Sequence, residues 1–101
     1  LAVYEITYDI NETDEAYEIY MYLNDPNHYF QVPYYIIYDL SEGFPIYYEE
    51  MMYDFIPDGD GKYVEFIINK PDLEHYQLII GTRGQMDMTI NQIIYDQIIE
   101  K

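Results

Sequence analysis

The chain has 101 residues, of which half are hydrophobic, and its formal net charge is −16. This length suits a single acidic domain over residues 1–101 with one modest core, and the apolar content argues against disorder. Because phosphate groups would be repelled, the composition excludes nucleic acid and anionic membranes as direct partners. A cationic protein surface or a metal ion is the kind of partner that this charge attracts.

Cysteine is absent, which excludes a disulfide framework, a thiolate nucleophile and a zinc–thiolate site. Small secreted domains often depend on disulfides, so we expect a cytoplasmic location. No apolar run approaches the roughly 18 residues that a membrane-spanning helix needs.

The first predicted element is a strand over residues 3–10, VYEITYDI. Its apolar residues, from Tyr4 to Ile10, fall at even positions, and its polar residues, including Asp9, fall at odd positions. Strict alternation is typical of a strand with one buried face.

Residues 13–24 carry two competing signals. Thr13 is a suitable N-cap, and Ala16, Ile19 and Leu23 recur at helical spacing, so we expect a helix here. The segment is also rich in Tyr and Ile, which favour strands. The alternative is a strand that pairs with the first one through a turn at NETD.

Three β-rich segments follow. Residues 29–40 are expected to form a strand that lies at a sheet edge or carries a bulge, because Pro33 interrupts it. Residues 46–56 and 62–69 flank the turn sequence PDGDG, and this arrangement predicts that the two segments form one hairpin.

The last third of the chain predicts a short central strand at residues 77–82 and a helix at residues 89–100. Thr89 and Gln92 have the spacing of a capping box, and isoleucines follow at helical spacing. The expected fold class is therefore α+β, with a small antiparallel sheet of about four to five strands and one or two helices on one face. An all-β barrel with a terminal helix is the alternative.

The sequence DGDGK resembles the centre of an EF-hand calcium loop. Asp58 and Asp60 would occupy the third and fifth loop positions, but the first and twelfth would hold Ile56 and Ile67. Because both end ligands are missing, we expect a hairpin turn whose glycines adopt positive φ, and no metal site.

No catalytic constellation is evident in the sequence. His28 and His75 are isolated, and no HxxxH or HxH spacing occurs. Glu49 and Glu50 are adjacent on an expected strand and would point to opposite faces, so they cannot act as an acid–base pair. We expect no enzymatic activity and no cofactor.

Charge and tyrosine are distributed unevenly. The first basic residue is Lys62, so the first 61 residues contain 14 carboxylates and no Lys or Arg. Twelve of the 15 tyrosines lie in the first 53 residues, interleaved with these acids. Tyrosine is a common strand former, but it is also enriched at interfaces, and beside a carboxylate it offers Arg both stacking and an ion pair.

Carboxylates at alternate strand positions lie about 6.6 Å apart, a spacing comparable with that of phosphates along a nucleic-acid strand. We expect such a phosphate-like ridge along the predicted hairpin or, as a second location, near residues 13–24. The candidate partner-binding residues are Tyr48, Glu49, Glu50, Tyr53, Asp54, Asp58, Asp60, Tyr63 and Glu65 on the hairpin, and Glu12, Asp14, Glu15 and Glu18 near residues 13–24.

In size, acidity and lack of catalytic residues, the chain resembles phage- and mobile-element-encoded anti-defence proteins, which include anti-CRISPR and anti-restriction proteins and inhibitors of uracil-DNA glycosylase. The resemblance implies a nucleic-acid-mimic inhibitor acting in a bacterial host cell. Its target would be the basic surface of a nuclease, a CRISPR effector, a restriction enzyme or a DNA-repair enzyme. The alternatives are an immunity protein that neutralises a basic nuclease toxin, and an acidic structural or regulatory subunit.

Overall fold

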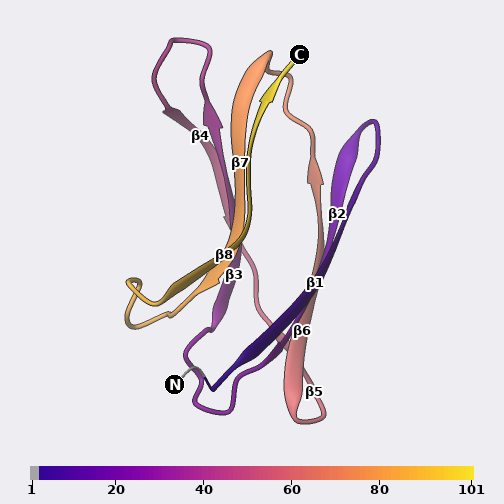
Figure 1. The fold of residues 1–101 in the computed structure, drawn as a ribbon, viewed down its shortest axis with the longest axis vertical. Coiled ribbons are helices and arrows are strands. Elements are labelled where there is room, and N and C mark those ends of the chain that lie inside the picture. The colour runs from indigo at the N-terminus through magenta and orange to yellow at the C-terminus, as the bar shows by residue number, and fades with distance from the viewer. Residues whose placement is uncertain (1–2) are drawn as a thin grey trace.

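A computed structural model describes residues 3–101, which form eight antiparallel strands in two four-stranded sheets. The strand order is β1-β2-β6-β5 in the first sheet and β4-β3-β7-β8 in the second. The two sheets pack face to face as a β-sandwich (Figure 1). The strands are β1 (Glu5–Glu12), β2 (Ala16–Asn24), β3 (Val32–Asp39), β4 (Ile46–Met52), β5 (Ile56–Asp58), β6 (Gly61–Asn69), β7 (His75–Arg83) and β8 (Asn91–Glu100).

The core lies between the sheets and is built from alternate residues of the four central strands. Because successive side chains on a strand point to opposite faces, each central strand contributes every second residue to this layer. The buried residues are Tyr17, Ile19, Met21 and Leu23 of β2, Val64, Phe66 and Ile68 of β6, Tyr35 and Ile37 of β3, and Tyr76, Leu78 and Ile80 of β7.

Aromatic residues connect the two sheets through the core. The hydroxyl groups of Tyr17 in β2 and Tyr76 in β7 are hydrogen-bonded at 2.8 Å, and both side chains are buried. Tyr53, in the segment between β4 and β5, stacks on Phe66 of β6 with ring centroids 4.2 Å apart. The sandwich is therefore held by a specific polar contact as well as by apolar burial.

Residues 13–24 form no helix, and the prediction of one was wrong. They form the β1–β2 turn and β2, which pairs with β1 along its whole length. Thr13 caps no helix, because its Oγ1 accepts hydrogen bonds from the backbone N–H groups of Glu15 and Ala16 within the turn. The alternative interpretation, a strand paired with the first one, is confirmed.

The predicted helix at residues 89–100 was also wrong, because this segment contains β8. Thr89 donates its backbone N–H and its hydroxyl to Asp87 in the β7–β8 turn. Ile99 packs against the core, whereas Ile98 is 62% exposed, as strand alternation requires. None of the described residues forms a helix long and apolar enough to cross a membrane.

The fold class is therefore all-β, which overturns the predicted α+β fold and the alternative barrel with a terminal helix. The strand predictions at residues 3–10, 62–69 and 77–82 are confirmed by β1, β6 and β7, and β7 is a central strand. The strand predicted at residues 29–40 is β3. Pro33 does not mark an edge, because β3 has a neighbour on each side, but β3 does carry a register irregularity against β4, between Ile37 and Tyr38.

The two segments predicted to form one hairpin lie in different sheets. β4 is an edge strand of the second sheet, and of the chain between β3 and β6 only the short strand β5 pairs with β6. The DGDG sequence forms the β5–β6 turn, where Gly59 has a φ of 61°. The turn and a positive φ at Gly59 were therefore predicted correctly, but Gly61 has no positive φ, and the incoming strand is β5 and not β4.

Loss of one hydroxyl from the Tyr17–Tyr76 pair should destabilise the sandwich. We expect Tyr17→Phe to lower the free energy of unfolding by about 1–3 kcal/mol, because the Tyr76 hydroxyl would stay buried without a partner. Tyr17→Phe/Tyr76→Phe should cost less than the sum of the two single variants. Urea unfolding of all four proteins measures this coupling, and strictly additive losses would contradict it.

Alkaline pH should weaken the same contact. Burial and then the hydrogen bond to Tyr76 raise the pKa of Tyr17 above its ordinary value of 10.0. This contribution to stability is full below pH 10 and is lost as the pH rises further, because the unfolded chain releases the proton first. The deficit of Tyr17→Phe relative to the native chain should therefore shrink above pH 10 in urea unfolding, and a constant deficit would refute this assignment.

Candidate functional site

The outer face of the first sheet gathers carboxylates and tyrosines. The odd-numbered residues of β2 from Tyr17 to Leu23 are buried, so its even-numbered side chains point away from the core. The strand register places matching side chains of β1, β6 and β5 on this same surface. We call it the acidic face, and its residues are Glu5 and Asp9 of β1, Glu18, Tyr20 and Tyr22 of β2, Asp58 of β5, and Tyr63, Glu65 and Ile67 of β6.

Tyr20 lies at the centre of the acidic face. Its directly paired residues are Asp9 on β1 and Glu65 on β6, one on each side. Glu18 stands two residues away on β2 and faces the same way. Neighbouring strands are about 4.8 Å apart and alternate residues about 6.8 Å apart, so three carboxylates surround this ring at short range.

The surface around Tyr20 is hollowed into a shallow, open concavity. The Asn11 side chain donates a hydrogen bond of 2.6 Å to Glu18, which orients that carboxylate at the margin. Carboxylates, an aromatic ring and an apolar side chain thus share one depression. The outward side chains that line it are Asp9, Asn11, Glu18, Tyr20, Glu65 and Ile67.

Tyrosine rings cover the middle of the acidic face. Tyr20, which is 37% exposed, stacks on Tyr63 with ring centroids 6.2 Å apart and an interplanar angle of 24°. The Tyr22 ring lies across Gly61 of β6, where a Cβ atom would overlap it. Glycine at this position therefore leaves room for the hydroxyl end of the Tyr22 ring against the neighbouring strand.

The first sheet contains a single Lys or Arg, and it points inward. Lys62 lies on the same side of β6 as buried Val64. Its Nζ is 3.7 Å from the Asp25 carboxylate and donates to the Phe30 carbonyl oxygen. Burial lowers the pKa of Lys62, and Asp25 opposes that shift. Among residues 3–101, no Lys or Arg lies within 4.0 Å of a carboxylate of the acidic face.

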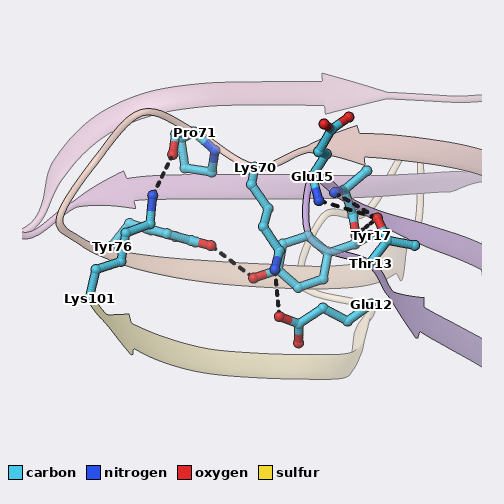
Figure 2. A network of polar contacts seen from close by, with 9 residues as sticks. Glu12, Thr13, Glu15, Tyr17, Lys70, Pro71, Tyr76 and Lys101 are labelled. Carbon is cyan, nitrogen blue, oxygen red and sulfur yellow. Dashed lines mark hydrogen bonds and ion pairs between the residues drawn. The ribbon is translucent and has the colours of Figure 1, made fainter.

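Lys70, which follows β6, is held at one end of the sandwich (Figure 2). Its Nζ is 2.7 Å from Glu12 and lies 5.3 Å from the centroid of the Tyr17 ring. The hydrogen bond to Glu12 raises the pKa of Lys70. Of the carboxylates predicted near residues 13–24, Glu12 thus has a cation within the chain, whereas Asp14 and Glu15 are exposed in the adjacent turn.

The structure does not unite the predicted hairpin residues in one ridge. Glu49 lies on the inner side of β4 and accepts a hydrogen bond from the Tyr35 hydroxyl. Glu50 lies on the outer face of the second sheet, where its carboxylate is 3.2 Å from Arg83. The two glutamates are therefore on opposite faces, as predicted, but both belong to the second sheet and neither lies on the acidic face.

Four further hairpin candidates also lie outside the acidic face. Tyr48 is exposed on β4, and Tyr53 packs against the core. Asp54 is exposed in the segment that crosses from β4 to β5, and Asp60 is exposed in the β5–β6 turn. The ridge failed as a prediction of geometry because β4 forms a hairpin with the preceding strand β3, through the turn at residues 40–45, and does not pair with β6.

The acidic face nevertheless unites members of both predicted groups. Glu18 comes from the group near residues 13–24, and Asp58, Tyr63 and Glu65 come from the hairpin group. Asp9 and Tyr20 were not among the residues predicted from the sequence, and neither were Glu5, Tyr22 and Ile67. A signal was present, because the alternation over residues 3–10 turned Asp9 outward, and the strand alternative for residues 13–24 would have placed Tyr20 beside it.

Comparisons with protein-family models, with curated proteins and with solved structures find no match. No group of three or more His, Cys, Asp or Glu side chains within residues 3–101 is placed to hold a metal ion. The chemistry that the acidic face offers is the binding of cationic side chains, by ion pairing to its carboxylates and by contact with its tyrosine rings.

Neutralising the acidic face should stabilise the fold. Like charges about 10 Å apart in water repel by about 0.4 kcal/mol, so we expect Asp9→Asn/Glu18→Gln/Glu65→Gln to raise the free energy of unfolding by about 0.5–1 kcal/mol at low salt. The gain should shrink as salt is added, because screening shortens the range of the repulsion. Thermal unfolding over a salt series measures both effects.

A matched control removes the same kinds of charge elsewhere. Glu42, Asp72 and Glu74 are exposed in the connections that precede β4 and β7. We expect Glu42→Gln/Asp72→Asn/Glu74→Gln to gain less stability, because these residues do not flank one another on a sheet. An equal increase in the free energy of unfolding of the two variants, or an increase that does not depend on salt, would contradict charge repulsion on the acidic face.

Proposed function

We propose that this chain is a nucleic-acid-mimic inhibitor that presents its acidic face to the basic nucleic-acid-binding surface of a partner protein. One observation carries the proposal: the first sheet turns Asp9, Glu18 and Glu65 outward around Tyr20, while its single Lys, Lys62, points inward. The carboxylates of this face thus have no Lys or Arg partner among residues 3–101.

Sheet geometry gives this surface the regularity that a mimic requires. Carboxylates on one face of a twisted sheet follow a lattice of about 4.8 Å between strands and about 6.8 Å along them. A partner that neutralises successive phosphates with Lys and Arg meets a comparable density of negative charge here. Long-range attraction would also speed the encounter with such a partner.

The partner class follows from the same charge complementarity. A nuclease, a CRISPR effector, a restriction enzyme or a DNA-repair enzyme carries a basic groove that a domain of this size can occupy. We favour a CRISPR effector, whose channels for guide and target strands are large and positively charged. The chain would then act inside a bacterial cell as an anti-defence protein and need no catalytic residue.

Competition with nucleic acid tests this proposal. The native chain is immobilised, bacterial lysate is applied, and the retained proteins are eluted with rising salt. We expect a nucleic-acid-binding protein that elutes at moderate salt and that loses its DNA or RNA when the chain is added to the purified pair. Asp9→Asn/Glu18→Gln/Glu65→Gln should weaken this competition at least about tenfold, in line with the loss of several ion pairs.

The variant Glu42→Gln/Asp72→Asn/Glu74→Gln serves as the matched control and should compete as well as the native chain. Two results would contradict the proposal. One is a retained partner that still binds its nucleic acid in the complex. The other is equal weakening by the two variants, which would show that net charge matters and the acidic face does not.

A further inference from the structure

Three of the four Lys and Arg residues are bound inside this chain in the same way. Each cation lies over an aromatic ring, 4.7–5.3 Å from its centroid, and within 4.0 Å of a carboxylate. The ring and carboxylate are Phe55 and Asp25 for Lys62, Tyr17 and Glu12 for Lys70, and Tyr34 and Glu50 for Arg83.

Arg83 shows which contacts a guanidinium group makes when it lies over a ring and beside a carboxylate. Its Cζ is 4.7 Å from the centroid of the Tyr34 ring. One amino group lies 3.2 Å from the Glu50 carboxylate, and the other contacts the sulfur of Met52 at 3.3 Å. A planar guanidinium can thus lay its face on a ring and donate from two of its edges at once, whereas the ammonium groups of Lys62 and Lys70 meet their ring and their carboxylate as point charges.

The concavity of the acidic face has the same components without an internal cation. Tyr20 supplies a partly exposed ring, and Asp9 and Glu65 flank it on the neighbouring strands. No Lys or Arg lies over Tyr20 in the part of the chain that the structure describes. Glu18 adds a third carboxylate to the same depression.

We propose that this concavity binds an arginine side chain of the partner protein, with its guanidinium over Tyr20 and its N–H groups directed to Asp9 and Glu65. The inference rests on the proposed function and identifies the side chain that the acidic face recognises. The two carboxylates lie on opposite sides of the ring, separated by two strand spacings of about 4.8 Å each. A guanidinium has donors on more than one edge and can reach toward both, whereas lysine is a single hydrated point charge.

Two cationic peptides of equal charge test the choice of arginine. Fluorescein-labelled nona-arginine and nona-lysine are titrated with the native chain at near-physiological salt, and binding is followed by fluorescence anisotropy. A stacking contribution typical of exposed cation–π pairs predicts that nona-arginine binds about twofold to fivefold more tightly. Tyr20→Leu should abolish this preference, while Tyr20→Phe, which keeps the ring, should retain it.

Amide NMR spectra establish that each variant is folded before its binding is compared. Equal affinity for the two peptides, or a preference that survives Tyr20→Leu, would overturn the arginine site and leave the broader proposal standing. The charge variants distinguish failure of the arginine site from failure of the acidic face as a cation-binding surface. If Asp9→Asn/Glu18→Gln/Glu65→Gln binds both peptides no more weakly than Glu42→Gln/Asp72→Asn/Glu74→Gln does, the acidic face is not the cation-binding surface and both proposals fail.

Discussion

The shortage of cations is the constraint on which this structure depends. Four Lys and Arg residues face 20 carboxylates, and three of the four are tied to acids within the chain. Lys62 contacts the buried Asp25 in the β2–β3 connection, Lys70 contacts Glu12 beside the β1–β2 turn, and Arg83 joins β7 to β4. These three cations lie in the interior, at one end of the sandwich and on the outer face of the second sheet. The acidic face is left with the charge that these contacts do not offset.

The strands place carboxylates that have no Lys or Arg partner among residues 3–101 together on one face of the first sheet. β2 is a central strand that buries its odd-numbered residues, so Glu18 and Tyr20 are forced outward by the same alternation that builds the core. Pairing with β1 and β6 then brings Asp9 and Glu65 to either side of Tyr20. The same register of β1, β2 and β6 therefore determines both the core and the acidic face. A slip of β2 by one residue would turn its core residues outward and its acidic-face residues inward. Repulsion on this face lowers stability, and a cationic partner would relieve it on binding.

The sequence predicted much of the strand content and little of the pairing. Alternation over residues 3–10 and 62–69 was unambiguous, and both segments form the expected strands. Residues 13–24 were ambiguous, because Ile19 and Leu23 fit both the helical stripe and a strand whose odd positions are buried. Thr13 contributed to the error, since a hydroxyl that accepts backbone N–H bonds serves a turn as well as a helix cap. The site was only partly predicted for the same reason: Glu18 and Glu65 were identified as candidates, but their convergence around Tyr20 depends on the β1–β2–β6 pairing.

Chemical-shift mapping tests the central claim, that the uncompensated acidic face is where cations bind, most directly. Amide resonances of the native chain are assigned and followed while unlabelled nona-arginine is added. We expect the largest shifts at Asp9, Glu18, Tyr20 and Glu65, and much smaller ones at Glu42, Asp72 and Glu74. Shifts spread evenly over the carboxylates, or concentrated around Glu50 on the second sheet, would contradict it.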